Sequence, residues 1–176
     1  MRTLLLSTFL VACGGGEQPA PKPAEHHEEP APAPKEEPAP APAKPDFASM
    51  NEEEQHKFLM EEGKNVYENS TLACKTCHGD EGKGQQGVFP PLVGQKDHMG
   101  DCAKHAGIVL WGLQGKLTVD GVDYDSAMTP QHAMLDDLQI AAVISYERHS
   151  WGNDYGWCSP DDVKKVRDAG DPNAAH

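Results

Sequence analysis

One short segment carries the clearest chemistry of this 176-residue chain. Cys74 and Cys77 are separated by two residues, and His78 follows directly. Cys-x-x-Cys-His is the attachment signature of c-type haem. Each thiol can form a thioether to one vinyl group, and the adjacent histidine is then held under the iron as an axial ligand. The segment therefore predicts one covalently bound haem, with Cys74, Cys77 and His78 as its binding residues.

Two other chemistries fit the same cysteines. A Cys-x-x-Cys pair can be a thioredoxin-like redox dithiol, but no alternation of strands and helices surrounds it and His78 would have no role. Cys74 and Cys77 also combine with Cys102 and His105 into a pattern that suits zinc. A zinc-binding structural protein therefore remains an alternative, and it would be colourless.

Composition excludes several classes of protein. The net charge of −13 argues against nucleic acid as a partner, and no apolar run reaches the roughly 20 residues of a transmembrane helix. Mean hydropathy is −0.63, and ten of the 15 prolines lie between Pro19 and Pro45. These values exclude a membrane-spanning protein and a large enzyme, and they leave a small domain with a separate proline-rich segment.

The first 46 residues predict an export signal and a tether. One positive charge precedes a short apolar run that ends in Leu10-Val11-Ala12-Cys13, which resembles a bacterial lipobox. The resemblance implies a signal peptide of residues 1–12 and a lipid on Cys13. Residues 13–46 have too few large apolar side chains to fold and predict a disordered tether. The protein would then be anchored at a membrane, facing the periplasm or the cell exterior. An ordinary signal peptide with an accidental cysteine is the alternative.

Residues 47–153 predict a mostly helical domain. Ser49 and Glu52 have the spacing of a capping box before a first helix that runs to about Glu68. Gly63 inside this helix suggests close packing of another backbone, and the small residues Ala141, Ala142 and Ser145 form a strip that could receive it.

Further helices are expected at 103–113, stopped by Gly115, and at 136–149, where Asp136 and Gln139 have the spacing of a capping pair. A last short helix is expected in the C-terminal extension of residues 154–176. Asp120-Gly121 lies between two short strand-like runs and predicts a hairpin turn. The fold class is therefore all-α, with long loops and one short β-hairpin.

Together with the attachment motif, the order of these features resembles the class I monohaem cytochromes c over roughly residues 58–153. In that family a proline twelve residues after the ligand histidine offers its carbonyl to the histidine Nδ1–H. Pro90 stands at this position and is followed by Pro91-Leu92. The resemblance implies a small cytochrome c-like domain around haem c, in which Pro90 orients His78.

The family's second axial ligand is usually a methionine in a loop before the last helix, commonly followed by proline. Met128-Thr129-Pro130 occupies that position, and Thr129 is a small departure from the pattern. The resemblance therefore implies Met128 as the second iron ligand. Met134 is the next candidate, and His98, Met99, His105 and His132 are the others that follow His78.

The five cysteines can all be given roles. Cys13 would take the lipid, and two others would take haem. Cys102 and Cys158 remain, and in an oxidising compartment they predict a disulfide. A second metal site built from His98, Cys102 and His105 is the alternative.

These observations predict a membrane-anchored, one-electron carrier that is not an enzyme. Haem with histidine and methionine ligands has no open position for a substrate, so the iron would cycle between Fe(III) and Fe(II). From Phe47 onward, 21 acidic side chains face 11 basic ones, which predicts a redox protein partner with a basic docking face. A fixed cytochrome subunit of a respiratory complex is the alternative, followed by a gas-binding haem sensor.

Overall fold

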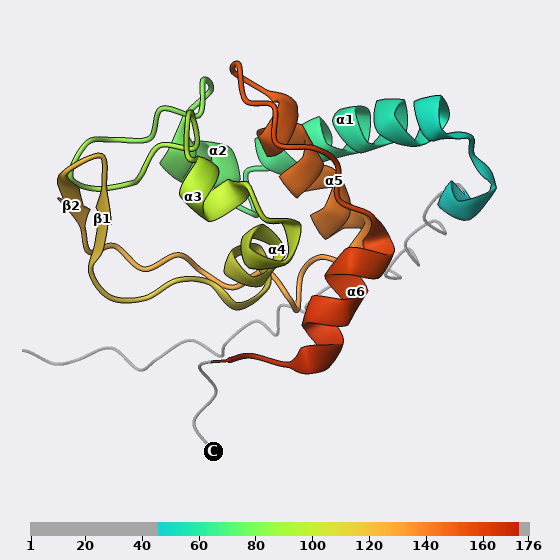
Figure 1. The fold of residues 1–176 in the computed structure, drawn as a ribbon. Coiled ribbons are helices and arrows are strands. Elements are labelled where there is room, and N and C mark those ends of the chain that lie inside the picture. The colour runs from blue at the N-terminus through green and yellow to red at the C-terminus, as the bar shows by residue number, and fades with distance from the viewer. Residues whose placement is uncertain (1–45, 173–176) are drawn as a thin grey trace, which may run out of the picture. The chain divides into compact units, whose positions relative to one another are not determined.

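The computed structural model describes residues 46–172, which belong to one compact unit. The predicted signal peptide, Cys13 and the tether up to residue 45 lie outside the described residues. The elements are η1 (Phe47–Ser49), α1 (Glu52–Glu68), α2 (Cys74–His78), α3 (Lys96–Met99), α4 (Cys102–Trp111), β1 (Leu117–Val119), β2 (Val122–Tyr124), α5 (Asp137–His149) and α6 (Pro160–Ala169). The predicted all-α class with one hairpin is confirmed (Figure 1).

The cap of α1 differs from the predicted one. The Asn51 side chain accepts a hydrogen bond from the Glu54 amide, and the Glu54 carboxylate accepts one from the Asn51 amide, both at 3.0 Å. Ser49 instead donates its hydroxyl to the Asp46 carbonyl at 2.8 Å, within the short η1 turn. The prediction of Ser49 and Glu52 as the capping pair is therefore wrong, because Asn51 and Glu54 offer the same chemistry two residues later.

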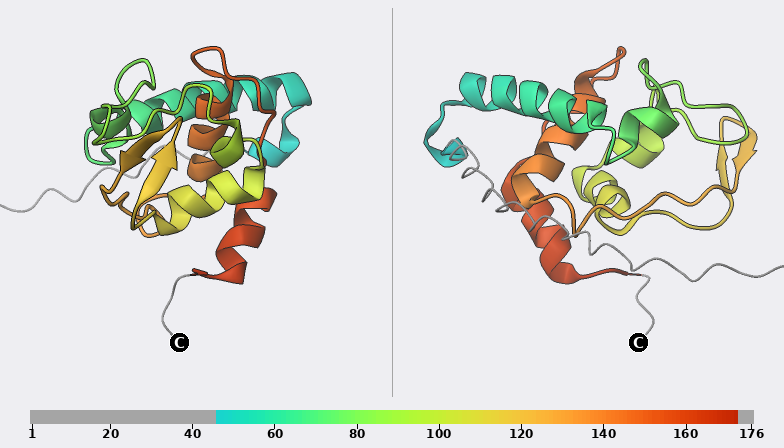
Figure 2. Two further views of the ribbon diagram at one scale, coloured as in Figure 1. Left: turned by 60° about the vertical axis from the view of Figure 1, so that its left-hand side comes forward. Right: turned by 180° about the vertical axis from the view of Figure 1, so that it is seen from behind.

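The core forms where α5 crosses α1 (Figures 1 and 2). Residues 140–144 of α5 are almost completely inaccessible to solvent, and Gly63 of α1 packs directly on Ala142. The predicted close packing at Gly63 is confirmed. The α5 capping box of Asp136 and Gln139 is also confirmed, since each residue's side chain accepts a hydrogen bond from the other's amide.

The hairpin turns at the predicted residues. β1 and β2 are antiparallel, and Asp120 and Gly121 turn the chain with φ values of 50° and 77°. The predicted end of the preceding helix is wrong, because α4 stops at Trp111 rather than at residue 113. Gly112, at φ 74°, ends it, and the amides of Gln131 and His132 bond the carbonyls of Val109 and Leu110.

The C-terminal extension packs against α4 and α5 through α6, on the opposite side of the domain from the hairpin (Figures 1 and 2). A disulfide joins Cys102, at the start of α4, to Cys158, with 5.8 Å between the Cα atoms. The buried Arg148 guanidinium donates to the carbonyls of Met99, Gly100, Tyr155 and Gly156. Within residues 46–172, no helix is both long enough and apolar enough to cross a membrane.

Candidate haem site

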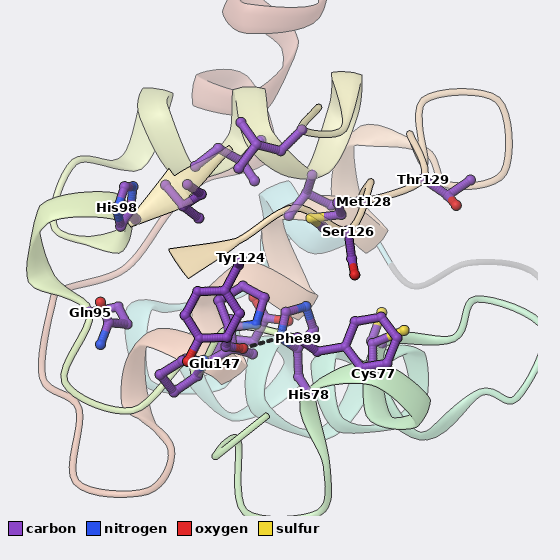
Figure 3. A pocket seen from close by; sticks show the side chains of 18 of the residues that line it. Cys77, His78, Phe89, Gln95, His98, Tyr124, Ser126, Met128, Thr129 and Glu147 are labelled. Atoms are coloured by element: carbon purple, nitrogen blue, oxygen red, sulfur yellow. Dashed lines mark hydrogen bonds between the residues drawn. The ribbon is translucent and has the colours of Figure 1, made fainter. Parts of the chain in front are cut away.

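The predicted haem-binding residues, which lie far apart in the sequence, line one cavity (Figure 3). Cys74, Cys77 and His78 lie in its wall, and Met128 does too. Most of the remaining lining is apolar. It comes from α4, α5, β1 and the loops around them, and includes Leu72, Phe89, Pro91, Leu92, Ile108, Val109, Leu113, Leu117, Val119 and Val143. A flat, largely apolar cofactor suits such a lining.

His78 is oriented by its main-chain surroundings. Its Nδ1 lies 2.9 Å from the carbonyl oxygen of Pro90. With the Nδ1–H donated to this carbonyl, the lone pair of Nε2 is free to bind a metal. The approach of the Pro90 loop requires Gly84, because a Cβ there would lie 2.3 Å from the Phe89 oxygen.

Contacts from α1 and the end of α5 hold the loop after α2. The Tyr67 hydroxyl of α1 donates to the Gly79 carbonyl at 2.7 Å. The Trp151 indole N–H donates to the Asp80 carbonyl at 3.1 Å. Asn153 accepts from the Gly94 amide at 2.9 Å and donates to the Leu92 carbonyl at 3.1 Å. The crossing of α1 and α5 thereby sets the position of His78.

Met128 lies in a loop that is fastened to the end of α4. Its amide donates to the Leu113 carbonyl at 2.8 Å, and its own carbonyl accepts from the Leu113 amide at 3.2 Å. Gly112 lets the two segments approach, because a Cβ there would lie 2.3 Å from the Met128 oxygen. Figure 3 shows the Met128 side chain across the cavity from the His78 ring.

Two of the other candidate ligands, Met134 and His132, lie outside the cavity, whereas Met99 lines it. Met134 is 58% exposed and does not line the cavity. The His132 ring nitrogen Nδ1 lies 3.3 Å from the Leu110 carbonyl, and that residue also lies outside the cavity wall. His98 and His105 do line the cavity, but the His105 ring is hydrogen-bonded to the carboxylate of Glu147.

The alternative metal sites lack support from the geometry. Cys102 is bonded to Cys158, so its thiolate is not available to either proposed metal site. Among residues 46–172, no group of three or more His, Cys, Asp or Glu side chains is arranged to hold a metal ion.

A buried pair of ionisable side chains, which was not predicted from the sequence, lies in the cavity wall. The Nε2 atom of His105 lies 2.9 Å from Oε2 of Glu147, and the two side chains are 4% and 6% exposed. Glu147 follows Val143 by four residues on α5, and both line the cavity. No local sequence signal points to this pair, because its two members lie 42 positions apart in the chain.

Burial also raises the pKa values of two ionisable groups that interact with Glu147. Burial, and next the charge of Glu147, raise the pKa of the Cys74 thiol to about 12. The same two causes, in the same order, raise the pKa of Tyr67 above its usual range. Both groups therefore remain protonated at neutral pH in the protein without thioether bonds.

Comparisons with known proteins agree with the geometry of this cavity. The cytochrome c family profile matches residues 60–151. Two cytochromes c-552 of Thermus thermophilus are 37% identical over 101 residues; the match covers 53% of this chain and 67% and 60% of theirs. The cytochrome c subunit of a quinone alcohol dehydrogenase from Gluconobacter oxydans is 32% identical over 102 residues, which cover 56% of this chain but 21% of that protein.

The apolar cavity, its two cysteines and the free Nε2 of His78 fit a covalently attached haem. The family profile spans more than half of the chain, from the middle of α1 to Trp151. The chain therefore belongs to the cytochrome c family, as a class I c-type cytochrome with covalently bound haem c and a role in electron transfer.

Proposed function

We propose that this protein is a one-electron carrier whose haem is attached through Cys74 and Cys77 and ligated by His78 and Met128. The bound haem supplies a one-electron Fe(III)/Fe(II) couple. His78 and Met128 would both bind the iron and exclude water from it, so no position would be left open for a substrate. The observation that carries this proposal is the position of Met128 across the cavity from His78, whose Nδ1 is held by Pro90.

The test is an absorption spectrum of the purified holoprotein in both oxidation states. A methionine–iron charge-transfer band is expected in the ferric protein and should disappear in Met128→Ala. Met134→Ala is the matched control, because Met134 is exposed outside the cavity. Loss of the band in the control instead would show that the ligand assignment is wrong. Tight binding of carbon monoxide to the ferrous wild type would favour a gas-binding protein.

The membrane anchor is a separate part of the proposal. It depends on the lipobox-like run before Cys13, which lies outside the described residues. A lipid on Cys13 would hold the protein at a membrane, facing away from the cytosol, and residues 14–46 would act as a flexible tether. Cys13→Ser should release the cytochrome from washed membranes into the soluble fraction. Equal membrane retention of the wild type and this variant would contradict a lipid anchor.

We further propose a redox partner with a basic docking face. Exposed carboxylates cluster on α1, at Glu52, Glu53, Glu54, Glu61 and Glu68. Such a surface speeds diffusional encounter with a positively charged protein, and salt screens this effect. Electron-transfer rates with candidate partners should therefore fall as ionic strength rises. Rates with an uncharged small reductant should stay constant, and equal rates with a protein partner at low and high salt would contradict steering.

A fixed subunit of a respiratory complex is the second candidate. The similarity to cytochrome c subunits of quinone alcohol dehydrogenases supports it, although the match covers 21% of those proteins. Purification from mild detergent distinguishes the two. A mobile carrier elutes alone, whereas a fixed subunit elutes in constant proportion with other redox proteins.

A further inference from the structure

The buried pair of His105 and Glu147 has no part in the haem attachment or ligation proposed above. Its atoms are 2.9 Å apart, and both side chains lie in the wall of the cavity. α4 supplies the histidine and α5 the carboxylate. Taking ionisable groups out of water costs free energy, and apolar side chains would fill the same position without that cost.

Hydrogen bonding indicates the charge of this pair. The Nδ1 atom of His105 is buried and has no hydrogen-bond partner in the described part of the chain. A protonated imidazole would place an N–H at Nδ1 without an acceptor. The neutral tautomer, with its hydrogen on Nε2, donates to Glu147 and leaves no N–H unpaired. Judged by the protein groups alone, the pair therefore carries the single negative charge of Glu147.

Several ionisable neighbours are already occupied. From α1, Tyr67 donates its hydroxyl to Gly79 and stays protonated. From α2, Cys74 is consumed by a thioether bond in the proposed holoprotein. On α5, the Arg148 guanidinium is directed to main-chain carbonyls and its charge faces Asp101, at the start of α4.

Two titratable side chains of the cavity wall remain beside the pair. They are His98, on α3, and Tyr124, on β2. The carboxylates of the haem itself would add two more groups. A test of the pair must therefore distinguish its effect on the reduction potential from the effects of these groups. His98 is a suitable comparison because it is also a histidine.

We propose that His105 and Glu147 form a redox-linked proton site, which is net negative beside ferric iron and takes up one solvent proton when the iron is reduced. This inference rests on the haem attachment proposed above. Reduction brings one electron from a partner protein and removes one positive charge from the cavity. The negative pair is then less compensated, so proton binding becomes more favourable. One electron and up to one proton enter together, and both leave on oxidation.

Proton uptake by the pair makes the reduction potential depend on pH. The potential should fall as pH rises, by up to about 59 mV per pH unit for one proton per electron. A pair that only stabilises the fold would add nothing to the pH dependence of the potential. The negative charge also stabilises Fe(III), so removal of the charge should raise the potential at the alkaline end of the range.

The experiment is a redox titration of the holoprotein between about pH 5 and pH 8, the range in which histidine commonly titrates. Glu147→Gln keeps the size of the side chain and removes its charge, and it should flatten the pH dependence. His98→Asn is the matched control and should retain it. The double variant His105→Leu/Glu147→Leu replaces the pair with apolar side chains and should also give a potential that does not depend on pH. It provides a second test in case the single variant misfolds.

Proton uptake can also be measured directly. On reduction in weakly buffered solution with a pH-indicating dye, the wild type should take up protons and Glu147→Gln should not. A wild-type potential that does not change with pH, or a slope that survives in Glu147→Gln, overturns the proton site. The absorption spectrum distinguishes this result from a failure of the proposed ligation, because the methionine–iron band reports on Met128 and not on the pair.

Discussion

Gly63 of α1 faces the main-chain carbonyl of Ala142 of α5 so closely that a Cβ at Gly63 would lie 2.1 Å from that oxygen. The same Cβ would lie 2.6 Å from the Cβ of Tyr146. The helix crossing therefore depends on the missing side chain. The crossing in turn supports the haem cavity, because α1 supplies Tyr67 to the loop after His78 and α5 supplies Glu147 to the wall.

Gly63→Ala should destabilise the holoprotein by about 1–3 kcal/mol, because overpacking forces two main chains apart. Free energies of unfolding in urea measure this effect. Gly107→Ala is the matched control inside α4, where the new Cβ would meet only Val166, at 3.8 Å. There the better helix propensity of alanine should be neutral or stabilise by up to about 1 kcal/mol. A similar effect at both positions would contradict the close-contact argument.

Gly112→Ala should displace the Met128 loop. The residue has φ 74°, and a Cβ would lie 2.3 Å from the Met128 oxygen. We expect the variant to keep its covalent haem, to lose the methionine–iron band in part or in full, and to have a lower reduction potential. Gly170→Ala separates backbone strain from contact, since Gly170 also ends a helix, has φ 82° and would place a Cβ with no atom within 4 Å. Gly170 lies outside the cavity wall. The control should retain the band, and loss of the band in Gly170→Ala alone would contradict the prediction.

The disulfide should contribute to stability through its long loop. Its cysteines are 56 residues apart, so the chain-entropy relation gives about 4 kcal/mol. The double variant Cys102→Ala/Cys158→Ala should lose most of this amount in urea unfolding. Dithiothreitol should destabilise the wild type by a similar amount and leave the double variant unchanged. An undiminished free energy of unfolding in the variant would contradict the prediction.

The α6 capping box should make stability depend on acid pH. The Ser159 hydroxyl donates to the Asp162 carboxylate at 2.7 Å, and this hydrogen bond is the main cause that lowers the pKa of Asp162 below its ordinary 3.8. The folded state has the lower pKa, so the stabilisation is present above that ordinary value and is lost as pH falls through the lowered one. Ser159→Ala should cost about 1 kcal/mol near neutral pH. The cost should shrink at acid pH, and a cost that grows there would refute this linkage.

Much of the local structure could be predicted from the sequence alone. Three features depend on residues within about four positions of one another: the haem motif, the Asp136–Gln139 cap and the Asp120-Gly121 turn. Residues this close in sequence are also close in the folded protein, so the sequence pattern is enough to predict the local structure. The class I cytochrome family and its haem c could therefore be predicted, and the comparisons confirm both. Local signals also failed where two equal ones competed, because Ser49 and Asn51 both have a glutamate three residues later.

Packing between distant elements decided the rest. His105 looked like one of several spare histidines, because its partner Glu147 lies 42 positions later and comes close only when α4 and α5 pack. The carbonyls that surround Arg148 come from the end of α3 and from the segment before α6, and the sequence gives no sign of these contacts. Main-chain carbonyls occur at every residue, so only the tertiary structure decides which of them meet a given side chain. The residues that can bind haem could therefore be identified from the sequence, whereas only the packing of α4 on α5 brought His105 and Glu147 together.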